Sequence, residues 1–294
     1  MITYYSKNTM YFDKKYKTIF VAEKYTFWHL RGANKMTQQE LLEAIKKGDP
    51  MAMCIAGDVC VDEFFKNHDA EKSLLPAEKW YEKATKTDSE YFVYALYKLS
   101  TIKAIWAKAY MEVTEIGVEA EEKWEEVLKL SEKVINMLND GVAGAQRVDK
   151  DKAIRHYYDV KYEVALCNYV LENFQLAMQL TEKIDAKRYR IIYWNSLAEM
   201  NKEKYVYAIK QLEFIYGDTE YGEAVKGINE EIVYAITALR LSSMYREIEK
   251  DLNKSVKVLN FVKNYFKNES LIERVDGELA HYKQGFLGNW KYIN

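Results

Sequence analysis

Two neighbouring stretches constrain the fold of this chain more than any other feature of its sequence. In the first stretch, Asp49 is suited to cap a helix, and Pro50 stands at the first helical position, where a missing N–H costs nothing. Small residues then recur at Ala52, Ala56 and Gly57. Because these residues recur at helical spacing, they let a second helix approach closely.

The second stretch, Ala77 to Ala84, supplies a candidate for that second helix. Trp80 and Ala84 lie four residues apart and therefore share one helix face, where a bulky side chain stands beside a small one. We predict that the two stretches form one helical hairpin with Trp80 and Ala84 at its seam.

The hairpin resembles a Sel-one-like repeat, a subclass of the tetratricopeptide superfamily. The resemblance is carried by Ala52-x-x-x-Ala56-Gly57, by Ala77-x-x-Trp80-Tyr81-x-x-Ala84 and by a turn at Asp88, and it covers residues 40–97. The pattern Leu41-Leu42-x-x-Ile45 recurs 39 residues later as Trp80-Tyr81-x-x-Ala84, a spacing slightly above the ~34-residue tetratricopeptide period. The resemblance implies a solenoid of stacked helical hairpins.

Residues that interrupt helices are rare, with only two prolines and 12 glycines in 294 residues. Their scarcity favours helix because both residue types destabilise helix interiors. Residues 1–30 differ, since they are rich in the aromatic and β-branched residues that are typical of strands. We therefore predict an all-α fold, an α-solenoid of tetratricopeptide and Sel-one-like hairpins, with a short N-terminal cap that is β-rich (a β-hairpin) or irregular.

Helix signals follow one another along the chain. Thr37 and Glu40 form a capping box, and Asp251 is suited to cap a later helix. The glycine-containing stretch at 140–144 is the strongest break in the helical pattern and the expected boundary if the chain has two lobes. Helices are predicted at 50–65, 74–86, 89–112 and 119–138, and an apolar stripe at 228–239.

A second internal repeat joins residues 165–178 to residues 196–209 at an offset of 31 residues. Each unit has the pattern of a helix, a tight turn carrying an aromatic residue, and a second helix. The repeat resembles degenerate tetratricopeptide hairpins over 157–218, but its turn is shorter and Asn201 stands where a Tyr is expected. We expect four parts: an N-terminal aromatic cap at 1–36, Sel-one-like repeats at 37–139, tetratricopeptide-like repeats at 150–284, and a tail at 285–294 that caps the last helix.

Charge and hydropathy exclude several classes of function. The net charge is −2, so nothing points to nucleic acid or to an anionic membrane. No run approaches the ~20 apolar residues of a membrane span, and no N-terminal signal pattern occurs. The three cysteines fall within helical patterns and are expected to be small buried thiols in a reducing compartment. We expect a cytoplasmic protein and no membrane partner.

No motif for chemistry is present. The four histidines are scattered singly, no Cys-x-x-Cys occurs, and the phosphate-binding and nucleophile motifs are missing, so we predict no metal, no cofactor and no catalytic residues. The acidic cluster at 119–126 is interpreted as a solvated helix face near a helix N-terminus. A dispersed active site that includes His156 and Tyr157 is the weakest of the alternatives.

The leading prediction is a non-enzymatic protein-interaction module that binds a peptide or protein in the concave groove of the array. The alternatives are a bacterial sensor or regulator, or a toxin-neutralising protein on the same scaffold, and an enzyme with a dispersed site. The tetratricopeptide resemblance implies which positions of the first helices face the groove, and the sequence makes no prediction of oligomeric state. The predicted partner-binding residues are Lys161, Asn168, Asn195, Glu199 and Lys202.

Overall fold

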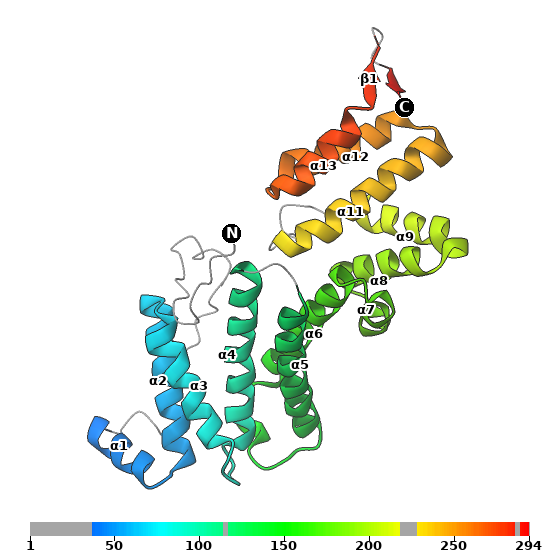
Figure 1. Ribbon diagram of the computed structural model, residues 1–294. Helices are drawn as coiled ribbons and strands as arrows, with labels where there is room; N and C mark the ends of the chain where they lie inside the picture. The colour runs from blue at the N-terminus through cyan, green and yellow to red at the C-terminus, as the bar shows by residue number, and fades with distance from the viewer. Residues whose placement is uncertain (1–36, 114–116, 218–227, 286–288, 294) are drawn as a thin grey trace. The chain divides into compact units, whose positions relative to one another are not determined.

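The computed structural model describes residues 37–113, 117–217, 228–285 and 289–293, which are drawn as ribbons in Figure 1. The chain forms two compact units. Unit 1 comprises Met1–Tyr110 and Glu122–Val160, and unit 2 comprises Met111–Glu121 and Lys161–Asn294. The predicted N-terminal cap at 1–36 lies outside the described residues.

Unit 1 is built from helices that follow one another along the chain. Thr37 caps the first helix with the predicted capping box, in which its hydroxyl accepts from the Glu40 N–H at 3.3 Å. Asp49 caps the second helix, and its carboxylate accepts from the Met51 N–H at 2.8 Å. The elements are α1 (Gln38–Lys46), α2 (Pro50–Asn67), α3 (Ala70–Ala84), α4 (Phe92–Val113), α5 (Val118–Asn139), η3 (Ala145–Arg147) and α6 (Lys150–Val170), of which α4, α5 and α6 also extend into unit 2.

The predicted hairpin is the pair α2 and α3, which lie against each other in Figure 1. Its seam differs in one residue from the sequence expectation. Ala84 is fully buried as expected, but the bulky side chain beside it is Tyr81, which is also fully buried. Trp80 is only partly buried, and the Lys83 ammonium lies 4.5 Å from the centre of its ring. The helix is rotated so that Tyr81 enters the core, because Gly57 on α2 leaves room for its ring.

The glycine-containing break at 140–144 lies inside unit 1. Gly144 has a positive φ of 85°, and a Cβ at this position would collide with the backbone carbonyl of Glu90 in the turn before α4. Arg147 adds an ion pair to Glu90 at 2.6 Å and places its guanidinium 4.2 Å from the centre of the Tyr91 ring. These contacts tie the turn to α4, so the turn closes a unit instead of separating two.

Unit 2 continues the pattern of sequential helix pairs. The two hairpins of the 31-residue repeat are present. In the first, one helix ends at Val170 and the next begins at Phe174; in the second, one helix ends at Met200 and the next begins at Tyr205. Asp251 caps a helix as predicted, accepting from the Lys254 N–H at 3.0 Å. The elements are α7 (Phe174–Thr181), α8 (Lys187–Met200), η4 (Lys202–Lys204), α9 (Tyr205–Gly217), α11 (Ile228–Met244), η5 (Tyr245–Glu249), α12 (Leu252–Tyr265), α13 (Glu269–Leu279), β1 (Tyr282–Gln284) and β2 (Trp290–Tyr292).

The β-hairpin of the described residues lies at the C-terminus, whereas the sequence placed one at the N-terminus. Tyr282 pairs with Tyr292 and Gln284 with Trp290 in antiparallel register. Tyr282 is buried, and Trp290 and Tyr292 pack against the unit 2 core. The hairpin, which follows α13 in Figure 1, forms because these aromatic side chains gain a core to cover.

The fold is therefore mostly α, with sequential helix pairs that are consistent with a helical-repeat array. Each unit has its own apolar core, one centred on α2, α3 and α4 and the other on α6, α8, α9, α11 and α12. Within the described ranges, no helix is both long enough and apolar enough to cross a membrane.

Candidate partner-binding surface

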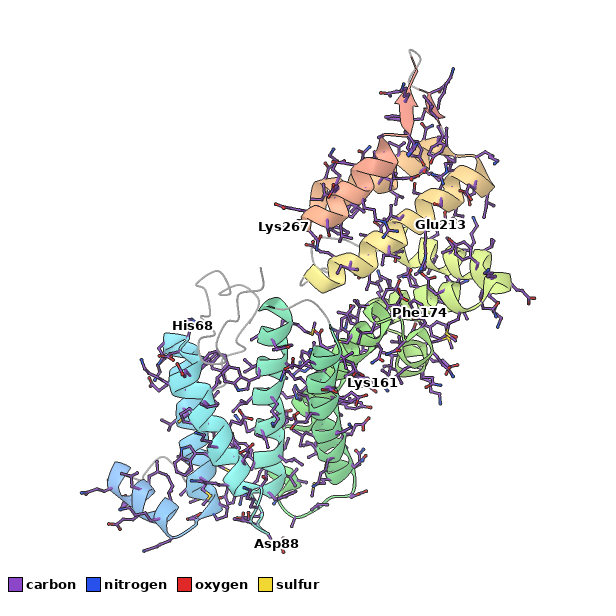
Figure 2. The ribbon with its side chains drawn as sticks, viewed as in Figure 1. His68, Asp88, Lys161, Phe174, Glu213 and Lys267 are labelled. Carbon is purple, nitrogen blue, oxygen red and sulfur yellow. The ribbon has the colours of Figure 1, made fainter. Side chains whose placement is uncertain are left out.

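The five predicted partner-binding residues lie in unit 2 but not in equivalent environments. Lys161 on α6, labelled in Figure 2, is half-buried. Lys202 in η4 is exposed, and Glu199 on α8 keeps 42% of its side chain exposed. Asn168 on α6 and Asn195 on α8 are fully buried.

Asn195 belongs to a polar seam between α8 and α11. Its amide donates to the Thr237 hydroxyl on α11 at 2.7 Å and to the carbonyl of Ile191 at 2.9 Å. Its side-chain oxygen accepts from Arg240, whose guanidinium also reaches the Asn195 carbonyl at 3.3 Å. The amide group is thus fully engaged within the fold.

Arg240 connects three helices through this seam. Its side chain is only 10% exposed, and its guanidinium forms an ion pair with Glu199 on α8. It also donates to the hydroxyl of Tyr169 on α6, which opposes the rise in the Tyr169 pKa that burial causes. A buried cation needs paired and hydrogen-bonded neighbours, and α6 and α8 supply them.

Asn168 on α6 is also held by hydrogen bonds within the fold. Its amide donates to the carbonyl of Val164 at 3.0 Å and to Glu121 at 3.2 Å, and its oxygen accepts from Asn173 at 3.3 Å. The two asparagines therefore face neighbouring segments of the fold instead of an open groove. In this structure a partner can reach Glu199 and Lys202, while Asn168 and Asn195 are inaccessible to it.

A hollow of about 630 Å³ lies nearby, where α7 begins and α8 ends. Phe174, labelled in Figure 2, lies at the start of α7 and lines the hollow together with Leu176 and Met200. Leu176 and Met200 are 37% and 46% exposed, which is high for apolar side chains. The remaining lining residues are polar: Glu172, Asn173, Gln175 and Gln179.

Unit 1 holds a second polar network, centred on Asp58 of α2. Its two carboxylate oxygens accept from the hydroxyls of Tyr81 on α3 and Tyr94 on α4, each at 2.6 Å. The Lys98 ammonium lies 3.1 Å from the same carboxylate. Burial and the negative charge of Asp58 both raise the pKa of Tyr94, so the phenol stays protonated and acts as a donor. The network joins three helices and leaves Asp58 well satisfied.

The dispersed-site alternative would depend on His156, and the structure gives this residue a buried environment. Its Nε2 lies 2.8 Å from the Ser100 hydroxyl, which lies 2.8 Å from that of Ser131. Burial lowers the His156 pKa to about 4, so the imidazole is neutral near pH 7. Ser100 and Ser131 are buried, and none of these three residues lines the hollow where α7 begins.

Two of the five glutamates in the acidic cluster of α5 form ion pairs with lysines. Glu126 pairs with Lys103 at 3.0 Å, and Glu125 pairs with Lys129 at 3.2 Å. In the part of the chain that the structure describes, no group of His, Cys, Asp and Glu side chains is arranged to hold a metal ion.

No protein-family model, no curated protein and no solved structure matches this chain. The likeness to tetratricopeptide and Sel-one-like repeats therefore depends on the residue pattern and on the sequential helix pairs.

Sequence reasoning missed several of these residues, notably Arg240, Asp58 and Tyr94. One signal for the seam was available: Thr237 is a polar residue at helical spacing from the apolar Val233, Tyr234 and Leu241. A polar residue on an apolar helix face marks a position whose hydrogen-bond partner comes from another helix.

Proposed function

We propose that this protein is a non-enzymatic interaction module that binds an extended peptide segment of a partner protein at the hollow between α7 and α8. The observation that carries the proposal is the pair Leu176 and Met200, two exposed apolar side chains on the wall of one hollow. Exposed apolar groups that line a concave site are typical of binding surfaces.

The polar lining of the hollow favours a peptide over a purely apolar ligand. Asn173, Gln175 and Gln179 carry side-chain amides, which both donate and accept hydrogen bonds. Such groups match the N–H and C=O of an extended backbone, while Leu176 and Met200 accept an apolar side chain. Met is suited to this role because its flexible thioether adapts to different shapes.

The proposed binding site therefore does not include the buried Asn168 and Asn195. Glu199 and Lys202 flank Met200 in the sequence and remain accessible, so they are retained as candidates for the rim of the site. Asn168 and Asn195 support the site from within the fold.

The test is to pan a random peptide library against the full chain and to measure binding of the enriched peptides. We expect Leu176→Lys with Met200→Lys to weaken binding at least tenfold, because each charge is placed where an apolar group should be buried. The matched control is Val59→Lys with Leu75→Lys, which changes two apolar residues of unit 1 that are 42% and 41% exposed.

Both double variants should fold, since all four positions are exposed. If no peptide is enriched, or if the enriched peptides bind both double variants as tightly as the unmodified chain, the proposal is wrong.

A further inference from the structure

The C-terminal hairpin presents two lysines on one face. Lys283 on β1 stands directly opposite Lys291 on β2, and both are exposed. The flanking pair, Tyr282 and Tyr292, occupies the other face, where the two rings lie 4.9 Å apart and pack against the unit 2 core. Because side chains alternate along a strand, the lysine pair points away from the core.

This pairing is unfavourable within the hairpin itself. Side chains directly opposite each other on antiparallel strands have Cβ atoms about 4.5–5.5 Å apart, and like charges there destabilise the pair. Neither lysine forms an ion pair with any residue that the structure describes. A two-stranded hairpin is only marginally stable. The fold therefore tolerates a repulsion between Lys283 and Lys291 that a bound anion would relieve.

The nearby carboxylates are already engaged elsewhere. Glu278 pairs with Arg246 beneath the hairpin. Asp251 caps α12, and Glu249 lies 3.3 Å from the Lys254 ammonium. These three acidic groups are thus engaged within the fold and do not balance the lysine pair.

A third lysine lies beside the hairpin. Lys250, at the end of η5, is exposed and lines a hollow of about 500 Å³ together with Asn289, Trp290 and the helix-capping Asp251. It too has no ion-pair partner within the described ranges. Positive charge is therefore present both on the hairpin face and at its edge.

We infer that Lys283 and Lys291, with Lys250 at their side, form a second interaction surface that binds an acidic segment of a partner protein. The charges are complementary to such a segment, and opposite charges steer binding partners together. A protein is favoured over a nucleic acid because the chain carries a net charge of −2, whereas nucleic-acid affinity depends on many phosphate contacts. This surface is separate from the hollow between α7 and α8.

The experiment measures binding of a fluorescein-labelled decapeptide of alternating Glu and Ser to the full chain at low salt. We expect Lys283→Glu with Lys291→Glu to weaken binding at least tenfold, since two attractions become repulsions. The matched control, Lys183→Glu with Lys257→Glu, makes the same change of charge at two exposed lysines elsewhere in unit 2 and should change binding less than twofold.

The single variant Lys283→Glu separates folding from binding. It creates an opposite-charge pair with Lys291, so its melting temperature should equal or exceed that of the unmodified chain while its affinity for the peptide falls. The inference is overturned if the peptide does not bind, if the hairpin and control variants bind it equally, or if a single-stranded oligonucleotide or an anionic vesicle binds more tightly than the peptide through the same lysines.

Discussion

The hydroxyl of Tyr81 donates to the carboxylate of Asp58 at 2.6 Å, across a separation of 23 residues in the chain. The bond forms only because the Tyr81 ring passes directly over Gly57, the residue before Asp58. A Cβ built on Gly57 would lie 2.6 Å from the ring carbon that carries the hydroxyl. A glycine and an aspartate in consecutive positions thus accommodate one tyrosine, the first by leaving space for the ring and the second by accepting a hydrogen bond from its hydroxyl.

The first prediction concerns this space. Gly57→Ala should lower the free energy of unfolding by about 1–3 kcal/mol, because the added methyl group overpacks the α2–α3 seam. Gly277→Ala is the matched control, since Gly277 is also helical and nothing lies within 4 Å of its Cβ position. The control should stabilise the chain by up to about 1 kcal/mol through helix propensity. Urea denaturation measures the free energy of unfolding of both variants. Equal changes in the two would show that the Tyr81 ring does not pack closely against Gly57.

The second prediction concerns the Asp58 network. Tyr81→Phe and Tyr94→Phe should each cost about 1.5–3 kcal/mol, because each removes a hydrogen bond to a carboxylate that is largely buried. The double variant should deviate from additivity by about 0.5–3 kcal/mol, since both hydroxyls donate to the same group. Strict additivity in a double-mutant cycle would show that the two bonds are independent.

The third prediction separates the two polar residues of α8. Asn195→Ala should destabilise the chain by about 2–3 kcal/mol, because it leaves Thr237 and the buried guanidinium of Arg240 short of partners. Glu199→Gln should cost at most about 1 kcal/mol, since that carboxylate is 42% exposed. Thermal denaturation at one pH compares them. If the Asn195→Ala variant is as stable as the unmodified chain, the polar contacts of Asn195 do not stabilise the fold.

The fourth prediction is a pH dependence that arises from His156. Burial lowers its folded-state pKa to about 4, below the value of about 6.5 expected in the unfolded chain. The unfolded chain therefore gains a proton first as pH falls, and His156 should remove about 2–3 kcal/mol of stability between pH 7 and pH 4.5.

Replacing the histidine tests this dependence. His156→Gln should flatten the fall in stability between pH 7 and pH 4.5, although it lowers stability at pH 7 by disturbing the contact with Ser100. His68→Asn is the control, because His68 is an exposed helix-end residue with a positive φ that Asn tolerates. The control variant should lose as much stability between pH 7 and pH 4.5 as the unmodified chain does. If the His156→Gln variant loses the same amount, groups other than His156 cause the pH dependence.

The sequence predicted most of the helix boundaries because they depend on local interactions. The Thr37 capping box, the Asp49 cap with Pro50, and the two turns of the 31-residue repeat are all set by residues within a few positions of one another. The choice between Trp80 and Tyr81 was harder, because adjacent positions differ by about 100° around a helix and only the facing glycine decides between them.

The candidate site was predictable only in part. Asn195 was predicted to face the groove and bind a partner, but it is buried and contacts Arg240, which lies 45 residues later. No local pattern links the two residues. The hollow between α7 and α8 was also missed, since it depends on where Met200 ends one helix relative to the start of another.

The polar seam has a consequence for the modularity of the array. In an idealised solenoid the hairpins are interchangeable, and removing one whole repeat leaves a shorter array with the same joints. Deleting 31 residues from this chain would bring α6 to the position of α8 and set Arg240 against Val164 and Asn168, in place of Asn195 and Glu199. The guanidinium would then lie against an aliphatic side chain with no carboxylate to balance it. At this joint, α8 is thus matched to α11, and α6 cannot take its place with the same contacts.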